Sequence, residues 1–200
     1  MRVTVLTLDQ RDSRLHGDTV PTLVDLLDSP ALPRPPMRPF QRTAGDELQG
    51  VVDDAGTAVE VVARVLRDGG WHLGLGIGEV ETPLPAETRA GRGAAFVRAR
   101  EAVTRAKSDV HRLAVVADPD ETAAEHLETV LGLWAGVLER RTAGGWEVHD
   151  LLGTGLPYAE AGRRLGISQS AVSQRARAAG LVDERRARAL AADLWGTLLP

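Results

Sequence analysis

Two short helical segments joined by a glycine constrain the fold of this 200-residue chain more than any other feature. Over residues 158–165, Ala161 and Leu165 stand at i, i+4 spacing and therefore share one face of a helix. Gly166 follows directly, where helices commonly end in the left-handed conformation that glycine adopts without strain. The next helix has an apolar face of its own, formed by Val172, Ala176 and Ala179. We expect the two helices to pack against each other across this turn.

The residues around the turn agree with this prediction. Pro157 suits the start of the first helix, because the N–H that proline lacks would be unpaired there. Ile167 is the apolar residue at the corner between the helices, and Ser168 is a good N-cap for the second helix. Local chemistry therefore specifies where each helix begins and ends.

Polar side chains occupy the other face of the second helix. They are Gln169, Ser170, Ser173, Gln174 and Arg177, with Arg175 to one side. In the major groove of DNA, glutamine can form two hydrogen bonds with adenine, serine can bond several base edges, and arginine can bond guanine or a phosphate. The alternative is an ordinary helical hairpin whose polar face is solvated.

The segment 158–181 resembles the helix-turn-helix of bacterial regulators and of the promoter-reading region of sigma factors, and residues 138–156 resemble the helix that precedes it in those proteins. The resemblance implies that the polar face and Ser168 contact double-stranded DNA. It also implies that Arg163 and Arg164 lie nearer to the phosphate backbone.

Charge is divided unequally along the chain, whose net charge is −4. From Arg140 to the end, nine arginines and six acidic residues give +3, whereas residues 1–139 carry −7. The basic part is the one that resembles a DNA-binding unit, and its charge is modest. We therefore expect salt-sensitive binding and a homodimer that doubles the contacts with DNA.

The chain has no cysteine and no run of about 18 apolar residues. It cannot form disulfides or zinc sites built on thiolates, and a membrane span is not expected. The first residues lead into a strand pattern rather than a signal peptide. We expect a cytoplasmic protein with no membrane partner.

The first 118 residues alternate between strand and helix patterns. The order is β-α-β-β-α-β-α-β, with strands expected at 2–8, 40–43, 47–53, 71–80 and 112–117 and helices at 20–27, 57–67 and 94–107. This order predicts a ferredoxin-like or palm-type sheet with its helices on one face. The chain is therefore expected to be α+β, with this sheet domain at 1–118 followed by an all-α helix-turn-helix domain.

Two further helices are expected after the sheet domain. Residues 119–142 are predicted to form a connecting helix with an apolar stripe of Leu127, Val130, Leu131, Trp134 and Leu138. The helix-turn-helix domain is expected at 143–200. It ends in an amphipathic helix at 183–199 whose inward residues are Ala187, Leu190, Leu194 and Leu198.

Segments of the sheet domain together resemble the palm domain of nucleotidyl cyclases and diguanylate cyclases. They are Leu8–Ser13, Thr43–Glu47, Gly74–Val80 and Gly91–Phe96. More closely, residues 1–117 are similar to the SatD family, which has the same Gly-Asp-Glu hairpin. The resemblance implies that Asp9 and Asp46 face each other and hold a divalent metal ion over a nucleotide phosphate.

One departure from the cyclase pattern concerns catalysis. In the cyclases, the helix after the glycine turn carries an asparagine and an arginine that steady the transferring phosphoryl group. Here Val97 and Glu101 take those places, and an apolar group and an anion cannot do that work. Arg98 and Arg100 lie nearby in the sequence. We expect no enzymatic activity and no catalytic residue, although a metal ion or nucleotide could still bind at Asp9 and Asp46.

Each of these features also has a purely structural explanation. Asp46 could serve only as the turn residue of a hairpin. Asp9 could cap the turn at Ser13 or pair with one of three arginines: Arg11, Arg14 or Arg42. Three glycines in the 71–80 strand could line a phosphate or let a helix pack closely: Gly74, Gly76 and Gly78.

The sequence as a whole predicts a sequence-specific DNA-binding protein, a bacterial transcriptional regulator whose N-terminal domain is sensory or mediates dimerisation. Two alternatives stay open. One is a divergent metal-dependent enzyme that binds or processes nucleotides and carries a helix-turn-helix. The other is a protein-interaction module that does not bind DNA.

Overall fold

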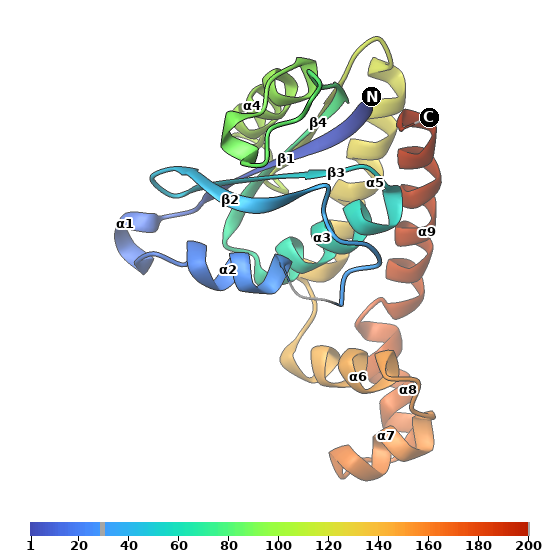
Figure 1. Ribbon diagram of the computed structural model, residues 1–200. Helices are drawn as coiled ribbons and strands as arrows, with labels where there is room; N and C mark the ends of the chain where they lie inside the picture. The colour runs from blue at the N-terminus through green and yellow to red at the C-terminus, as the bar shows by residue number, and fades with distance from the viewer. Residues whose placement is uncertain (29–30, 200) are drawn as a thin grey trace.

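The computed structural model describes residues 1–28 and 31–199, and it confirms the expected α+β class (Figure 1). A sheet and its helices form the upper body in Figure 1, and a smaller helical lobe lies below them. Ser29, Pro30 and Pro200, which fall within the predicted first and last domains, lie outside the described residues.

The sheet has five strands in the order β2-β3-β1-β4-β5. Their bounds are β1 Arg2–Gln10, β2 Arg38–Ala44, β3 Glu47–Val52, β4 Trp71–Glu79 and β5 Leu113–Ala117. Neighbouring strands are antiparallel except β4 and β5, which are parallel. With α2 (Val20–Leu27) and α3 (Ala55–Asp68) in the connections, β1 to β4 have the predicted ferredoxin-like order, and β5 extends the sheet beside β4.

Helices cover both faces of the sheet, so the expectation that they lie on one face is wrong. The first face is covered by α2, α3, α5 (Glu121–Glu139) and α9 (Leu181–Leu198), and the second by α4 (Ala94–Ala106). The reason is the composition of β1, where Val3 and Val5 pack toward α4 while Leu6 and Leu8 join the core on the opposite side. A strand that is apolar on both faces needs cover on both. Two short turns, α1 (Ser13–His16) and η1 (Thr88–Ala90), lie in the connections.

The segment predicted as a connecting helix belongs to the core of the sheet domain. Three residues of α5 are fully buried there: Leu127, Leu131 and Trp134. Three residues of α9 join the same core: Ala191, Trp195 and Leu198. The indole Nε1 of Trp195 donates a hydrogen bond of 2.8 Å to Thr4 Oγ1, which ties the C-terminal helix to β1. The expected division at residues 118 and 142 therefore does not separate independent cores.

The inward face of α9 differs from the predicted stripe. Leu190, expected to point inward, is 49% exposed, whereas Ala191 and Trp195 have no exposed surface. Burial of the large indole sets the rotation of α9 about its axis, and this rotation turns Leu190 to solvent.

The helical lobe consists of α6 (Ala143–Gly153), α7 (Tyr158–Leu165) and α8 (Gln169–Ala178). It joins the sheet domain through the end of α5 and the beginning of α9 (Figure 1). Within the described ranges, no helix is both long and apolar enough to cross a membrane.

Candidate nucleic-acid interface

The helical lobe has a small apolar core of its own. Val148 of α6, Ala161 of α7 and Val172 of α8 have no exposed surface, and Ala176 of α8 is nearly as deeply buried. Ile167 and several leucines surround them. Because every helix of the lobe contributes a fully buried residue, one face of α8 is held firmly against α6 and α7.

The turn between α7 and α8 has the predicted conformation. Gly166 has a φ of 65°, and the side-chain oxygen of Ser168 accepts a hydrogen bond of 3.1 Å from the N–H of Ala171. The N–H of Ile167 donates to the carbonyl of Gly162 at 2.9 Å. A Cβ on Gly162 would lie 2.7 Å from the carbonyl oxygen of Ile167, so this glycine is needed as well. A glycine inside a helical pattern is the sequence signal for such a close approach.

The polar face of α8 points to solvent. Its exposed residues are Gln169, Ser170, Gln174 and Arg177, and Ser173 is half-buried. Among the described residues, the side chains of Gln169, Gln174 and Arg177 make no hydrogen bond or ion pair. The hydroxyl of Ser170 lies 2.9 Å from that of Ser168. These side chains are accessible to a partner.

The remaining arginines of the predicted interface pair with acidic residues of the lobe. Arg163 and Arg164 both pair with Glu160, one turn earlier in α7, the latter at 3.7 Å. Arg175 Nη1 lies 3.6 Å from Glu147 of α6. All three arginines are exposed, and exposed ion pairs are weak enough for a phosphate to compete with them.

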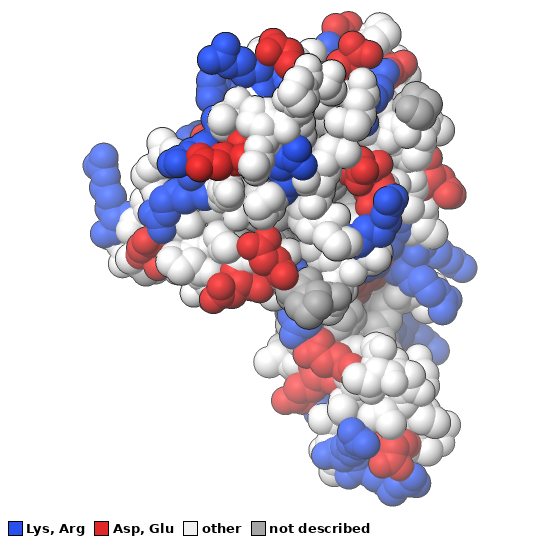
Figure 2. Space-filling model, viewed as in Figure 1, with Lys and Arg blue, Asp and Glu red and all other residues white. Residues whose placement is uncertain are grey.

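Charge is distributed differently over the two parts of the molecule. Figure 2 shows acidic and basic side chains mixed over the sheet domain, whereas basic side chains gather at the free end of the helical lobe. An acidic side chain lies among them, and further basic side chains lie where the lobe meets the sheet domain.

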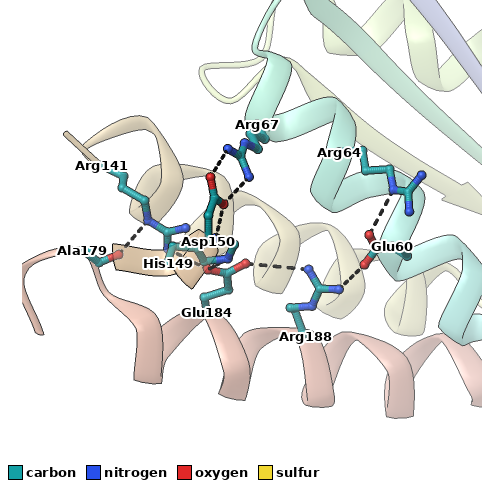
Figure 3. A network of polar contacts seen from close by, with 9 residues as sticks. All are labelled: Glu60, Arg64, Arg67, Arg141, His149, Asp150, Ala179, Glu184 and Arg188. Atoms are coloured by element: carbon teal, nitrogen blue, oxygen red, sulfur yellow. Dashed lines mark hydrogen bonds and ion pairs between the residues drawn. The ribbon is translucent and has the colours of Figure 1, made fainter. Parts of the chain in front are cut away.

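A group of charged side chains joins the lobe to the sheet domain (Figure 3). We call it the interdomain cluster, and its members are Arg67, Arg141, His149, Asp150 and Glu184. Arg141 precedes α6, and its side chain is fully buried. Its Nε donates to the carbonyl of Ala179 at 2.9 Å and its Nη2 to Glu184 Oε2 at 2.7 Å. This ion pair connects the start of the lobe to the beginning of α9.

A second ion pair connects the lobe to α3. Arg67 donates two hydrogen bonds to Asp150 of α6, at 2.6 and 2.8 Å. They lower the pKa of Asp150 to about 2. The guanidinium carbons of Arg67 and Arg141 lie 4.4 and 4.3 Å from the ring centroid of Trp146, where cation–π attraction adds to the contact.

His149 lies between the two carboxylates of the interdomain cluster. Its Nδ1 is 3.0 Å from Asp150 Oδ1, and its Nε2 is 3.5 Å from Glu184 Oε2. The contact with Glu184 raises the pKa of His149, and burial offsets only part of this rise. For Glu184, burial raises the pKa, but hydrogen bonds from His149 and Arg141 outweigh it and leave that pKa below its usual range.

Asp9 pairs with a residue that the sequence does not indicate. Its carboxylate lies 3.0 Å from Lys107, directly after α4. In the sheet register Asp9 stands opposite Glu47 of β3 and His72 of β4. Among the described residues, none of the three arginines considered as partners forms a hydrogen bond or ion pair with it. No local pattern could reveal Lys107, because it is 98 residues away in the sequence.

Asp46 lies in the turn between β2 and β3, where its carbonyl accepts a hydrogen bond of 3.1 Å from the N–H of Gln10. Within the described part of the chain, the carboxylate of Asp46 makes no hydrogen bond or ion pair. No group of three or more His, Cys, Asp or Glu side chains there is arranged to hold a metal ion.

The three glycines of β4 make room for α4. A Cβ on Gly74 would lie 2.2 Å from the backbone nitrogen of Val103, and one on Gly76 would lie 2.1 Å from that of Ala99. At Gly78 the nearest atom belongs to the guanidinium of Arg98, the end of a flexible side chain of α4, so this position is less constrained. Of the two explanations for these glycines, close helix packing is the one that the structure supports.

Val97 and Glu101, which the cyclase resemblance aligns with catalytic positions, are both exposed on α4. Comparison of the chain with protein-family models, with curated proteins and with solved structures gives no match.

Proposed function

We propose that this chain is a sequence-specific DNA-binding protein and a transcriptional regulator, in which α8 enters the major groove. The observation that carries the proposal is the free polar face of α8. Gln169, Gln174 and Arg177 are exposed and unpaired among the described residues, on a helix whose opposite face is fixed in the core of the lobe. A rigid helix that presents several unpaired donors and acceptors is suited to hydrogen bonding with base edges.

The contacts divide between bases and phosphates. Gln169, Ser170 and Ser173 lie in the N-terminal half of α8, the part of a recognition helix that reaches base edges in this motif. Glutamine is suited to adenine. Arg163 and Arg164 of α7 contact phosphates, with a phosphate oxygen taking the place of Glu160.

A homodimer would supply a second set of contacts. One lobe carries few basic side chains, and an isolated lobe would bind DNA weakly at physiological salt. Two copies related by a two-fold axis would present two recognition helices roughly 34 Å apart, one turn of DNA. We assign the sheet domain a role in dimerisation or sensing. The enzyme alternative has less support, because a metal ion at Asp9 would have to displace the ammonium group of Lys107.

Selection of bound fragments from a random pool of double-stranded DNA tests this proposal. We expect enrichment of a two-fold symmetric sequence. On that sequence, Gln169→Ala and Arg177→Ala should each weaken binding roughly tenfold, because each removes a group that contacts a base edge or a phosphate.

Arg100→Ala is the matched control for Arg177→Ala. It removes the same charge from an exposed position on α4, so DNA affinity should stay unchanged. A wild-type protein that enriches no sequence, or unaltered binding in both variants of α8, would overturn the proposal.

A further inference from the structure

His149 lies where the helical lobe meets the sheet domain, at the interdomain cluster, and we call this region the joint. The strength of the contacts in the joint depends on whether the His149 ring is protonated. Its ring nitrogens lie 3.0 Å from Asp150, on its own helix, and 3.5 Å from Glu184, on α9. A neutral imidazole has a single N–H and can donate to only one of these carboxylates, whereas an imidazolium can donate to both. A neutral ring that donates to Asp150, the nearer carboxylate, has no proton for Glu184, and one that donates to Glu184 turns an unprotonated nitrogen toward Asp150. The contact between α6 and α9 is therefore strongest when the ring is protonated.

The charged groups around His149 come from every element packed against it (Figure 3). Glu184 and Arg188 are on α9, where Arg188 lies 3.7 Å from Glu184 and also pairs with Glu60 of α3. Arg67 of α3 holds Asp150, and Arg141 holds Glu184. Both carboxylates beside His149 thus keep an arginine partner when the imidazole is neutral. Deprotonation should loosen the joint without unfolding either part.

We infer that protonation of His149 controls how firmly the helical lobe is held on the sheet domain. The imidazolium ties α6 to α9, and loss of its proton leaves the lobe freer to move. The consequence for DNA rests on the proposed function. A lobe that is already held in place loses less conformational freedom when it binds, so DNA affinity should be higher when His149 is protonated.

The direction of the pH effect follows from the contacts of His149. Its pKa is raised in the folded protein, chiefly by Glu184. The stabilising contribution of the imidazolium is therefore complete below the ordinary histidine pKa of about 6.5, and it is lost as the pH rises through the higher folded value. Trp146, whose ring centroid lies 5.2 Å from that of His149, is a neighbouring reporter of the change.

The first experiment uses the full chain without DNA. Hydrogen-exchange protection factors, which remove the intrinsic pH dependence of exchange, are measured for the amides of α6 at about pH 6 and pH 8. In the wild type, protection of α6 should fall several-fold at the higher pH. In His149→Gln it should be the same at both. His126→Gln, at an exposed position on α5, is the control and should behave like the wild type.

A second measurement keeps the inference testable if His149→Gln fails to fold. In an NMR titration of the histidine rings, the pKa of His149 should lie above the ordinary histidine value of about 6.5 in the wild type. It should move down in Asp150→Asn, which removes one of the two carboxylates. Equal protection of α6 at both pH values in the wild type would overturn the inference, as would a pKa of His149 that Asp150→Asn leaves unchanged.

A third measurement separates this inference from the proposed function. DNA affinity is compared at the same two pH values for the wild type and His149→Gln, and only the wild type should lose extra affinity at the higher pH. Absence of DNA binding at any pH would defeat the proposed function and leave the hydrogen-exchange result standing. An equal change in both proteins would show that the joint is not coupled to DNA binding.

Discussion

The Arg141 guanidinium donates a hydrogen bond of 2.7 Å to the carboxylate of Glu184, and this ion pair is buried where the helical lobe meets the sheet domain. None of the Arg141 side chain and only 8% of the Glu184 side chain are exposed. Removing one partner of a buried ion pair leaves the other charge buried without a counter-charge. The resulting loss of stability is larger than the net stability that the intact pair adds relative to apolar residues in its place. The joint is therefore sensitive to substitution.

Arg141→Met tests this sensitivity. The variant should lose about 3 kcal/mol in the free energy of unfolding, because Glu184 would stay buried with weaker partners. Urea unfolding followed by tryptophan fluorescence measures the loss. Arg140→Met, at the exposed neighbouring position, should change stability by less than about 0.5 kcal/mol. Equal stabilities of the two variants would contradict the prediction.

Gly162→Ala tests the turn between α7 and α8. The added methyl group would lie 2.7 Å from the carbonyl oxygen of Ile167, so the turn must open and stability should fall by about 1–3 kcal/mol. Gly153→Ala in α6 is the control, because its methyl group would have no neighbour within 4 Å. That variant should be neutral or up to about 1 kcal/mol more stable, since alanine favours helix. Thermal unfolding of the two variants side by side would settle the comparison.

Gly76→Ala tests the packing of α4 on the sheet. A Cβ there would lie 2.1 Å from the backbone nitrogen of Ala99, and a helix backbone cannot yield as a flexible side chain can. We expect a loss of about 3 kcal/mol or more, measured by chemical unfolding. Gly196→Ala in α9, with open space around its Cβ, should cause no loss. A well-tolerated Gly76→Ala would instead favour the idea that this glycine is kept for a ligand.

Acid stability should depend on Asp150. Hydrogen bonds from Arg67 hold its pKa at about 2, below the ordinary value of 3.8. The stabilising contribution is therefore present above pH 3.8 and is lost as the pH falls toward 2. Asp150→Asn should flatten the pH dependence of the free energy of unfolding in this range. Asp193→Asn, at an exposed position on α9, should retain the wild-type slope.

Short-range chemistry made the helix-turn-helix geometry predictable. Gly166 and Ser168 act on atoms within a few residues of themselves, so their roles could be inferred from sequence and appear in the structure as expected. The succession of strands and helices along the sheet domain was predictable for a similar reason, because strand and helix patterns follow the local spacing of apolar residues. The second apolar face of the sheet was not recognised, and helices were therefore expected on one face only.

Ion pairs between residues far apart in the sequence could not be predicted from local patterns. Asp9 meets Lys107 from 98 residues away, and Arg67 meets Asp150 from 83 residues away. Many arginines and carboxylates in this chain could pair, and the composition does not indicate which pairs form. Only the packing of α4 and of the lobe selects these partners.

The sequence by itself determined the α+β class, the helices of the lobe and the polar face of α8, because apolar spacing, glycine and N-cap signals act within one or two helical turns. Tertiary structure alone decided that α4 covers the second face of the sheet, that α9 is shared between both parts, and that His149 stands between two carboxylates. These features depend on which surfaces of already formed elements fit together. Side-chain volume and the pairing of buried charges settle that fit, and both involve residues far apart in the chain.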